Sequence, residues 1–215
     1  ADKGNGNYAT IDSLDEAKKA LVEQAGGTLV TIAKDVKIQV EFNPARVQAY
    51  RLIGYENRKL NDEDFNNDRK DAGDLGSGHT VTALYEIIPV GVKSDFHSID
   101  QLKYQPGTGT STAAENSDDW LTIKLRYKRP DGDKSHLLVH TLTGKPVALS
   151  KSGSDFRWSA SVAAFGMILT GSQYAGEWTC DDAIALAERA RGEDRQGYRI
   201  EFINMMKTYR LVIAQ

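Results

Sequence analysis

Apolar and polar residues alternate over residues 36–42 of the chain. This period of two is typical of a β-strand with one buried face, because successive side chains of a strand point to opposite sides. Asn43 and Pro44 end the pattern, since proline lacks a backbone N–H group and restrains the residue before it. A second apolar run follows at residues 47–55. The positions that we expect on the buried face of the first run are Val36, Ile38, Val40 and Phe42.

More strands are predicted further along the chain. Residues 80–90 are rich in β-branched side chains and predict a strand. Residues 120–128 alternate again, and residues 135–142 return after a turn at residues 129–133 that contains Pro, Asp and Gly. These two segments predict an antiparallel hairpin. Because antiparallel strands with one apolar face pack as layers, we expect residues 36–150 to form an antiparallel β-sandwich.

Apolar residues change to helical spacing in residues 151–215, which predict a C-terminal subdomain of three helices. Ser152 or Ser154 is expected to cap the first helix. Thr179 opens the second helix and Asp194 opens the third. The predicted apolar stripes are Trp158, Val162, Phe165 and Leu169 in the first helix, Ile184 and Ala187 in the second, and Tyr198, Phe202, Met205 and Tyr209 in the third.

The N-terminal segment has a mixed α/β pattern. Residues 8–11 predict a short strand, and Ser13 and Glu16 have the spacing of a capping box at the start of a helix. Two glycines at residues 26–27 weaken this helix. The apolar residues after them favour its continuation, with a defect at the glycines, to about residue 33.

Composition narrows the function classes. The 215 residues carry a net charge of -3, so we expect no general electrostatic attraction to the phosphate backbone of nucleic acids. No apolar run approaches the roughly 20 residues that cross a bilayer, and no signal peptide or lipidation motif is visible. Cys180 is the only cysteine, so no internal disulfide forms. We expect it to be a small buried residue near the start of a helix.

Local catalytic motifs are absent from the sequence, which has no G-x-S-x-G and no H-E-x-x-H. The acidic loop at residues 61–74 is the best metal candidate, because Ca²⁺ takes roughly six to eight oxygen ligands. The loop does not have the register of an EF-hand, and a solvated polar loop is the simpler interpretation. The candidate ligands are Asp62, Asp64, Asn66 and Asp68.

A third hypothesis is an enzyme with an acid–base site at the end of this loop. Asp71, Asp74 and His79 lie close together in the sequence, and Glu86 follows on the predicted strand. A histidine with carboxylates can perform acid–base chemistry. The simpler interpretation is that His79 bonds to the loop backbone where the strand begins.

Long consecutive stretches of the chain resemble a known group of proteins. KDVKIQVEFNPARVQAYRLIGYENR and DFNNDRKDAGDLGSGHTVTALYEIIPVG resemble the C-terminal region of bacterial von Willebrand factor type A proteins. In these envelope-associated proteins an A domain is followed by a domain of unknown function. The resemblance continues in LTIKLRYKRPDG and GYRIEFINMM. It implies a location in the bacterial cell envelope, and it brings no established enzyme activity.

The resemblance also implies that residues 1–35 are the last strand and helix of an A domain. GNGNYATIDSLDEAKKAL is similar to the way in which such domains finish. A domains bind Mg²⁺ through D-x-S-x-S, which this chain lacks. Any Mg²⁺ therefore belongs to the upstream A domain, and the resemblance assigns no metal ligand or other cofactor here.

Together these observations predict an α+β protein. The remnant of the α/β A domain precedes the antiparallel β-sandwich, and the three-helix subdomain follows it. The leading hypothesis for function is a non-catalytic protein-interaction or structural module that accompanies an A domain, with protein partners and no nucleic acid. The alternatives are a calcium-dependent binding or adhesion module that uses the acidic loop, and the enzyme with a site near Asp71, Asp74 and His79.

Overall fold

A computed structural model describes residues 9–24, 30–55, 62–67, 72–93, 114 and 116–213. The chain divides into two units, which are described separately. The first unit comprises residues 1–50, 54–81 and 87–144, and the second comprises residues 51–53, 82–86 and 145–215. The strands β2 (Val47–Ile53) and β4 (Leu84–Pro89) pair with each other and contribute to both units.

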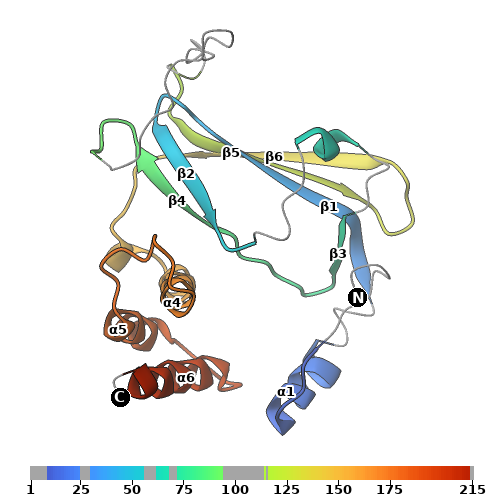
Figure 1. The fold of residues 1–215 in the computed structure, drawn as a ribbon. Helices are drawn as coiled ribbons and strands as arrows, with labels where there is room; N and C mark the ends of the chain where they lie inside the picture. The colour runs from blue at the N-terminus through green and yellow to red at the C-terminus, as the bar shows by residue number, and fades with distance from the viewer. Residues whose placement is uncertain are drawn as a thin grey trace. The chain divides into compact units, whose positions relative to one another are not determined.

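The first unit contains a four-stranded antiparallel sheet (Figure 1). Its strands, in spatial order, are β3 (Gly73–Gly76), β1 (Thr31–Phe42), β5 (Asp119–Lys128) and β6 (Ser135–Thr143). A turn in which the Gly132 N–H donates to the Arg129 carbonyl (3.0 Å) joins β5 to β6. The predicted hairpin is therefore confirmed.

Residues that pair across the strands lie on the same face of the sheet. On one face, named the apolar face, the cross-strand rows are Ile38–Leu125–Leu138, Val40–Ile123–His140 and Phe42–Leu121–Leu142. On the other, named the charged face, the rows are Lys37–Arg126–Leu137, Gln39–Lys124–Val139 and Glu41–Thr122–Thr141. The alternation in the sequence thus sorts apolar and charged side chains onto opposite faces, as predicted.

The start of β1 corrects the prediction for the N-terminal segment. The predicted helix continues to about residue 33, but β1 already begins at Thr31, and Ala33 pairs with Leu75 of β3. The pairing of β1 with its two neighbours outweighs the helical spacing, because a short apolar run fits either structure. The boundary expected at residue 35 consequently falls inside a strand.

The helix before β1 is short. It comprises α1 (Leu14–Lys18) and a π-helical turn, η1 (Lys19–Glu23). The Ser13 hydroxyl accepts a hydrogen bond from the Glu16 N–H (3.1 Å), which is one half of the predicted capping box. The Glu16 carboxylate forms an ion pair with Lys19. Residues 9–12 have no regular structure, so the predicted strand at residues 8–11 is wrong in its described part.

The first part of β2 contacts the end of the four-stranded sheet. The ring of Phe42 stacks on that of Tyr50, with centroids 4.2 Å apart, and Val47 is buried. The strand β4 is shorter than the predicted strand at residues 80–90, since residues 80–83 have no regular structure. The described sheets have four and two strands, so the prediction is confirmed at the level of antiparallel sheets followed by helices.

The second unit contains the three predicted helices, α4 (Ser154–Leu169), α5 (Cys180–Ala190) and α6 (Tyr198–Ile213). Phe165 of α4 is central to their core and meets the rings of Phe202 and Tyr209 of α6 edge-on. Such aromatic pairs stabilise a core beyond the area they bury. The buried residues of this core are Ala164, Phe165, Cys180, Ala183, Ile184, Ala187, Ile203 and Met206.

Two of the predicted helical stripes are displaced from the buried faces. In α4, Ser161 is buried while Val162 and Leu169 are exposed. In α6, Met206 is buried and Met205 is exposed. The small side chains of α4 and α5 allow close helix contacts, and hydrophobicity alone does not reveal this. The predicted stripe of α5, Ile184 and Ala187, is confirmed.

Side-chain caps fix two of the three helix starts. Thr179 and Asp182 form a complete capping box at α5. The Asp194 carboxylate accepts from the N–H groups of the first turn of α6. At α4 the prediction is wrong, because the N-cap is Gly153 and Ser152 bonds instead to the Leu149 carbonyl (2.7 Å).

Candidate functional site

In the described part of the four-stranded sheet, Lys37 is the charged residue whose side chain is buried, with 4% of its surface exposed. Its ammonium group donates to the carbonyl oxygens of Asp64 (3.2 Å) and Asn67 (2.5 Å). Both belong to the acidic loop, whose 3₁₀ turn η3 (Asp62–Asn66) contacts β1. The loop thereby covers part of the charged face, where a buried cation needs such acceptors.

Two further contacts attach the same turn to the sheet. Phe65 is buried, and the guanidinium of Arg126 lies 5.6 Å from the centroid of its ring. Arg126 also donates to the Asn66 side-chain oxygen (3.0 Å). An apolar anchor and two cations thus hold the turn, so its described contacts are those of a structural attachment.

These contacts bear on the predicted metal ligands. The side-chain oxygen of Asn66 accepts from Arg126, and the carbonyl of Asp64 accepts from Lys37. Both donors carry positive charge, which opposes a metal cation at the same oxygens. The side chain of Asp62 and the whole of Asp68 lie outside the described residues. Among the residues that are described, no group of three or more His, Cys, Asp or Glu side chains could hold a metal.

Asp35 forms a second polar cluster on β1, where the backbone adopts a positive φ of 51°. One carboxylate oxygen lies 2.6 Å from the Lys128 ammonium, and the other accepts from the Ala72 N–H (3.2 Å). The Asp35 N–H in turn donates to Asp74 (3.3 Å). A register irregularity occurs between Lys34 and Lys37. The cluster therefore stabilises a bulge, the feature that re-aims side chains on a strand.

The predicted acid–base residues have separate partners. Asp74 accepts from the Asp35 backbone, and His79 is exposed, with its own N–H donating to the Gly76 carbonyl (3.1 Å). Glu86 belongs to the second unit, where its carboxylate pairs with Arg51. Asp71 lies outside the described residues. No described contact joins these groups into an acid–base pair.

Arg51 carries no local sequence signal that would single it out. Its guanidinium lies 2.6 Å from the Glu86 carboxylate and 4.2 Å from the centroid of the Tyr174 ring. It also donates to the sulfur of Met167 in α4 (3.2 Å). Because one planar cation bridges both strands and α4, the cluster attaches this part of the sheet to the helices of the second unit.

Among the described residues of the second unit, four groups near α5 have a shifted pKa. Burial raises the pKa of the Cys180 thiol, and nearby Asp181 adds to this effect. Since the thiolate is the nucleophile, a raised pKa makes Cys180 inert, as expected of a buried structural cysteine. Hydrogen bonds from Thr179 lower the pKa of Asp182, and Lys207 lowers that of Glu188. The Asp181 carboxylate raises the pKa of Arg210. Each shift follows from a local structural contact.

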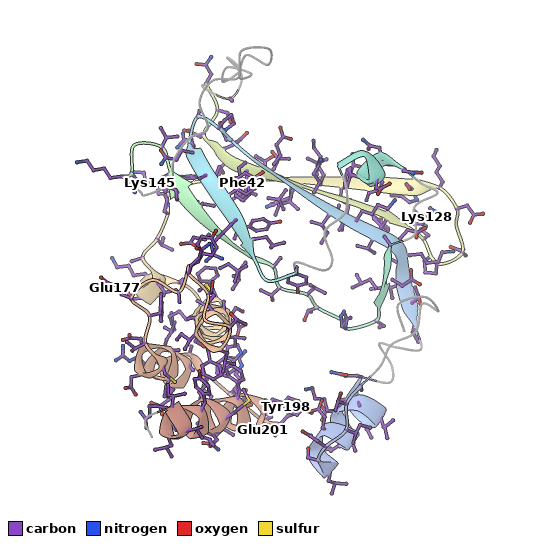
Figure 2. The ribbon with its side chains drawn as sticks, in the orientation of Figure 1. Phe42, Lys128, Lys145, Glu177, Tyr198 and Glu201 are labelled. Carbon is purple, nitrogen blue, oxygen red and sulfur yellow. The ribbon has the colours of Figure 1, made fainter. Side chains whose placement is uncertain are left out.

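The apolar face is covered unevenly. At one end Phe42 is buried against Tyr50, whereas Ile38, four residues earlier on the same face of β1, is 58% exposed. Leu138 of β6, in the same row as Ile38, is 55% exposed. Figure 2 shows Phe42 and Lys128 at opposite ends of the sheet, and the exposed row lies between them. Contiguous exposed apolar side chains of this kind mark interaction sites.

The exposure of Ile38 contradicts its predicted burial. Ile38 was expected on a buried face and Lys37 on a solvated one, but the acidic loop covers Lys37 while no described residue covers Ile38 to the same degree. The candidate functional site is therefore the exposed part of the apolar face. Its exposed members are Ile38, Ile123, Leu138 and Leu142.

The fold and these contacts define a mixed α+β protein of antiparallel sheets and C-terminal helices, with an exposed apolar sheet face. The chain belongs to the family described as "Uncharacterized protein YfbK, C-terminal", which it matches over residues 27–212. Among the residues that the structure describes, no helix has the length and apolar character needed to span a bilayer.

Comparison with curated proteins supports the same family. The chain is 44% identical over 207 residues to "Uncharacterized protein YfbK" of Escherichia coli (strain K12). The alignment covers 96% of the chain and 35% of the relative, so the chain spans about a third of that protein. No solved structure matches the chain.

Proposed function

We propose that the chain is a non-catalytic protein-interaction module whose apolar face binds another part of a longer protein. The observation that carries this proposal is the row Ile38–Leu125–Leu138, in which both outer members are more than half exposed. Aliphatic side chains in adjacent strands form a continuous surface, and burying it against a partner is favourable.

The proposed occupant of this face is a von Willebrand A domain in the same polypeptide. The long relative supports this, because 65% of it lies outside the aligned region and leaves room for further domains. The resemblance of residues 1–35 to the end of an A domain is the second support. Mg²⁺ in that upstream domain and a location in the bacterial cell envelope are parts of the same proposal.

The charged groups do not favour the two alternative functions. A calcium-dependent module needs the oxygens of the acidic loop, and Lys37 and Arg126 already bind several of them. An enzyme needs its acid and base to meet, and Asp74 and Glu86 bind a backbone N–H and an arginine respectively. A partner-binding surface makes no such demand on these residues.

The test is calorimetric titration of residues 1–215 with the part of the Escherichia coli relative outside the aligned region, prepared as a separate polypeptide. We expect binding that Ile38→Asp weakens at least about tenfold, because a carboxylate in the contact must be desolvated. The matched control is Leu211→Asp, since Leu211 is 62% exposed on α6. Absence of binding, or equal effects of the two substitutions, would contradict the proposal.

A further inference from the structure

A polar side chain lies among the exposed members of the apolar face. His140 of β6 belongs to the row Val40–Ile123–His140 and is itself exposed. Along β6 its neighbours on the same face are Leu138 and Leu142, which are 55% and 48% exposed. Across the ladder it pairs with Ile123 of β5, the strand beside β6 (Figure 1). A partner that covers these apolar side chains therefore covers the imidazole as well.

An imidazole in an apolar contact makes binding sensitive to protons. Histidine is the side chain whose charge ordinarily changes at about pH 6.5. A charged imidazolium that enters an apolar contact loses its hydration without gaining a counter-charge, whereas the neutral ring loses much less. The free protein then binds a proton that the complex rejects. Affinity is consequently full above the titration range and falls as the pH drops through it.

The described groups around His140 provide no counter-charge for an imidazolium. The three rows of the apolar face contain no Asp, Glu, Lys or Arg. Strand β2 reaches this face through Tyr50, whose ring stacks on that of Phe42. The charged residues of β2 and of its neighbour β4 are Arg51 and Glu86, and they pair with each other (2.6 Å). The chain itself therefore does not favour the charged form of this ring in a contact.

Another histidine of the same face, His136, has different surroundings. It is half-buried, and its ring centroid lies 5.6 Å from that of Tyr127. It lies four residues from His140, which is about 13 Å along a strand, so salt screens the charge of one ring from the other. The row of Tyr127 and His136 lies beyond Ile38 and Leu138, toward the end of β5. His140, which has aliphatic neighbours both along and across the sheet, is the histidine that a contact surrounds.

We propose that His140 makes binding at the apolar face depend on pH, so that the face binds its partner at neutral pH and releases it under mildly acidic conditions. This inference rests on the proposed function, because it concerns the same face and the same occupant, a further domain of the longer polypeptide. It adds a regulation of that contact, and it assigns the proton-sensitive group to a single side chain.

The test is calorimetric titration of residues 1–215 with the separately prepared polypeptide described above, at pH 7.5 and at pH 5.5. At the lower pH about nine in ten ordinary imidazoles carry a proton, and at the higher pH about one in ten does. We therefore expect the unmodified chain to bind about tenfold more weakly at pH 5.5 than at pH 7.5.

Two substitutions of His140 separate the charge of the side chain from its shape. His140→Gln is polar and neutral at both pH values, so its affinity should change less than about twofold between them. His140→Lys is charged at both, so it should bind about tenfold more weakly than the unmodified chain at pH 7.5. The matched control is His79→Gln, since His79 is exposed and belongs to none of the rows of the apolar face. It should keep the full pH dependence.

The outcomes distinguish this inference from the proposed function. Absence of binding at pH 7.5 would contradict the proposed function and, with it, the inference that depends on it. Binding at pH 7.5 that is as strong or stronger at pH 5.5 would leave the proposed function in place and overturn the role of His140. A pH dependence that persists in His140→Gln would overturn that role too, because acid effects on folding or on the partner also act on this variant.

Discussion

At the scale of single residues, Lys37 determines how the acidic loop attaches to the sheet. Its ammonium group is buried and donates to two backbone carbonyls that lie 27 and 30 residues away in the chain. An alternating strand pattern assigns Lys37 to the solvated face, and it contains no signal that a distant loop covers that face. The burial of Lys37 could therefore not be predicted from local sequence.

Replacing Lys37 with methionine tests this attachment. Methionine keeps the length and apolar contacts of the side chain but removes the ammonium group that donates to the carbonyls of Asp64 and Asn67. We expect Lys37→Met to lower the free energy of unfolding by about 1–3 kcal/mol in urea denaturation. Lys124→Met is the control, since its ion pair with Glu41 is exposed and should contribute less than about 1 kcal/mol. Equal losses of unfolding free energy for the two variants would contradict the role of Lys37 in attaching the acidic loop to the sheet.

The capping carboxylate of Asp182 makes stability depend on pH. Thr179 lowers the pKa of Asp182 below its ordinary value of 3.8, so the folded state binds this proton less readily than the unfolded state. The stabilisation is fully present above that pH and is lost as the pH falls through the folded-state pKa.

We expect Asp182→Asn to lower the melting temperature at pH 7, and the difference from the unmodified chain to shrink as the pH falls below 3.8. Glu193→Gln is the control, since Glu193 forms an exposed pair with Arg195 and caps no helix. The measurement is thermal unfolding by circular dichroism across this pH range. A difference that does not change with pH would contradict the proposed role of the carboxylate.

At the scale of elements, α4 offers the same substitution at two glycines with opposite expected effects. Gly171 follows the helix with φ of +59°, and the hydrogen bonds from Gly171 and Ser172 to the last turn satisfy its carbonyls. Gly166 lies inside the helix, and an added Cβ there meets no atom within 4 Å. The first position needs the conformational freedom of glycine and the second does not.

We expect Gly171→Ala to destabilise the chain by about 1–2 kcal/mol, because alanine is strained at positive φ. Gly166→Ala should stabilise it by about 0.5–1 kcal/mol through lower backbone entropy in the unfolded state. Chemical denaturation of otherwise identical chains measures both changes in the free energy of unfolding. A stabilising Gly171→Ala would show that the helix does not end in this way.

The elements that sequence predicted well are those with strong local signals. The hairpin of β5 and β6 combines clear alternation with a Pro-Asp-Gly turn, and the capping box of α5 is local by nature. The start of β1 has no such local signal, because its first residues fit a helix equally well until β3 and β5 pair with them. In α4, the small Ser161 is buried in place of Val162, and its hydroxyl donates to the Trp158 carbonyl (2.7 Å), so the buried polar group is satisfied.

At the scale of the molecule, the candidate site followed from the structure more than from the sequence. The alternation identified the apolar face correctly, but it predicted that the face is buried within the chain. Only the strand register and the exposure of Ile38 and Leu138 show that one row stays uncovered. The charged residues that the sequence suggested as ligands or catalysts make structural contacts where they are described. These contacts give no support to the two alternatives, and the proposed function stays with the leading hypothesis of a non-catalytic interaction module.

The most direct test of the central claim is the rate of thiol labelling at Ile38→Cys, with and without the remainder of the Escherichia coli relative. Cys180 is the only native cysteine and is buried, so it contributes little background. We predict that the added polypeptide slows labelling of Ile38→Cys at least about tenfold, as expected of a contact residue, and leaves the control Leu211→Cys unchanged. Equal labelling rates at Ile38→Cys with and without the polypeptide would contradict the assignment of the apolar face as a binding surface.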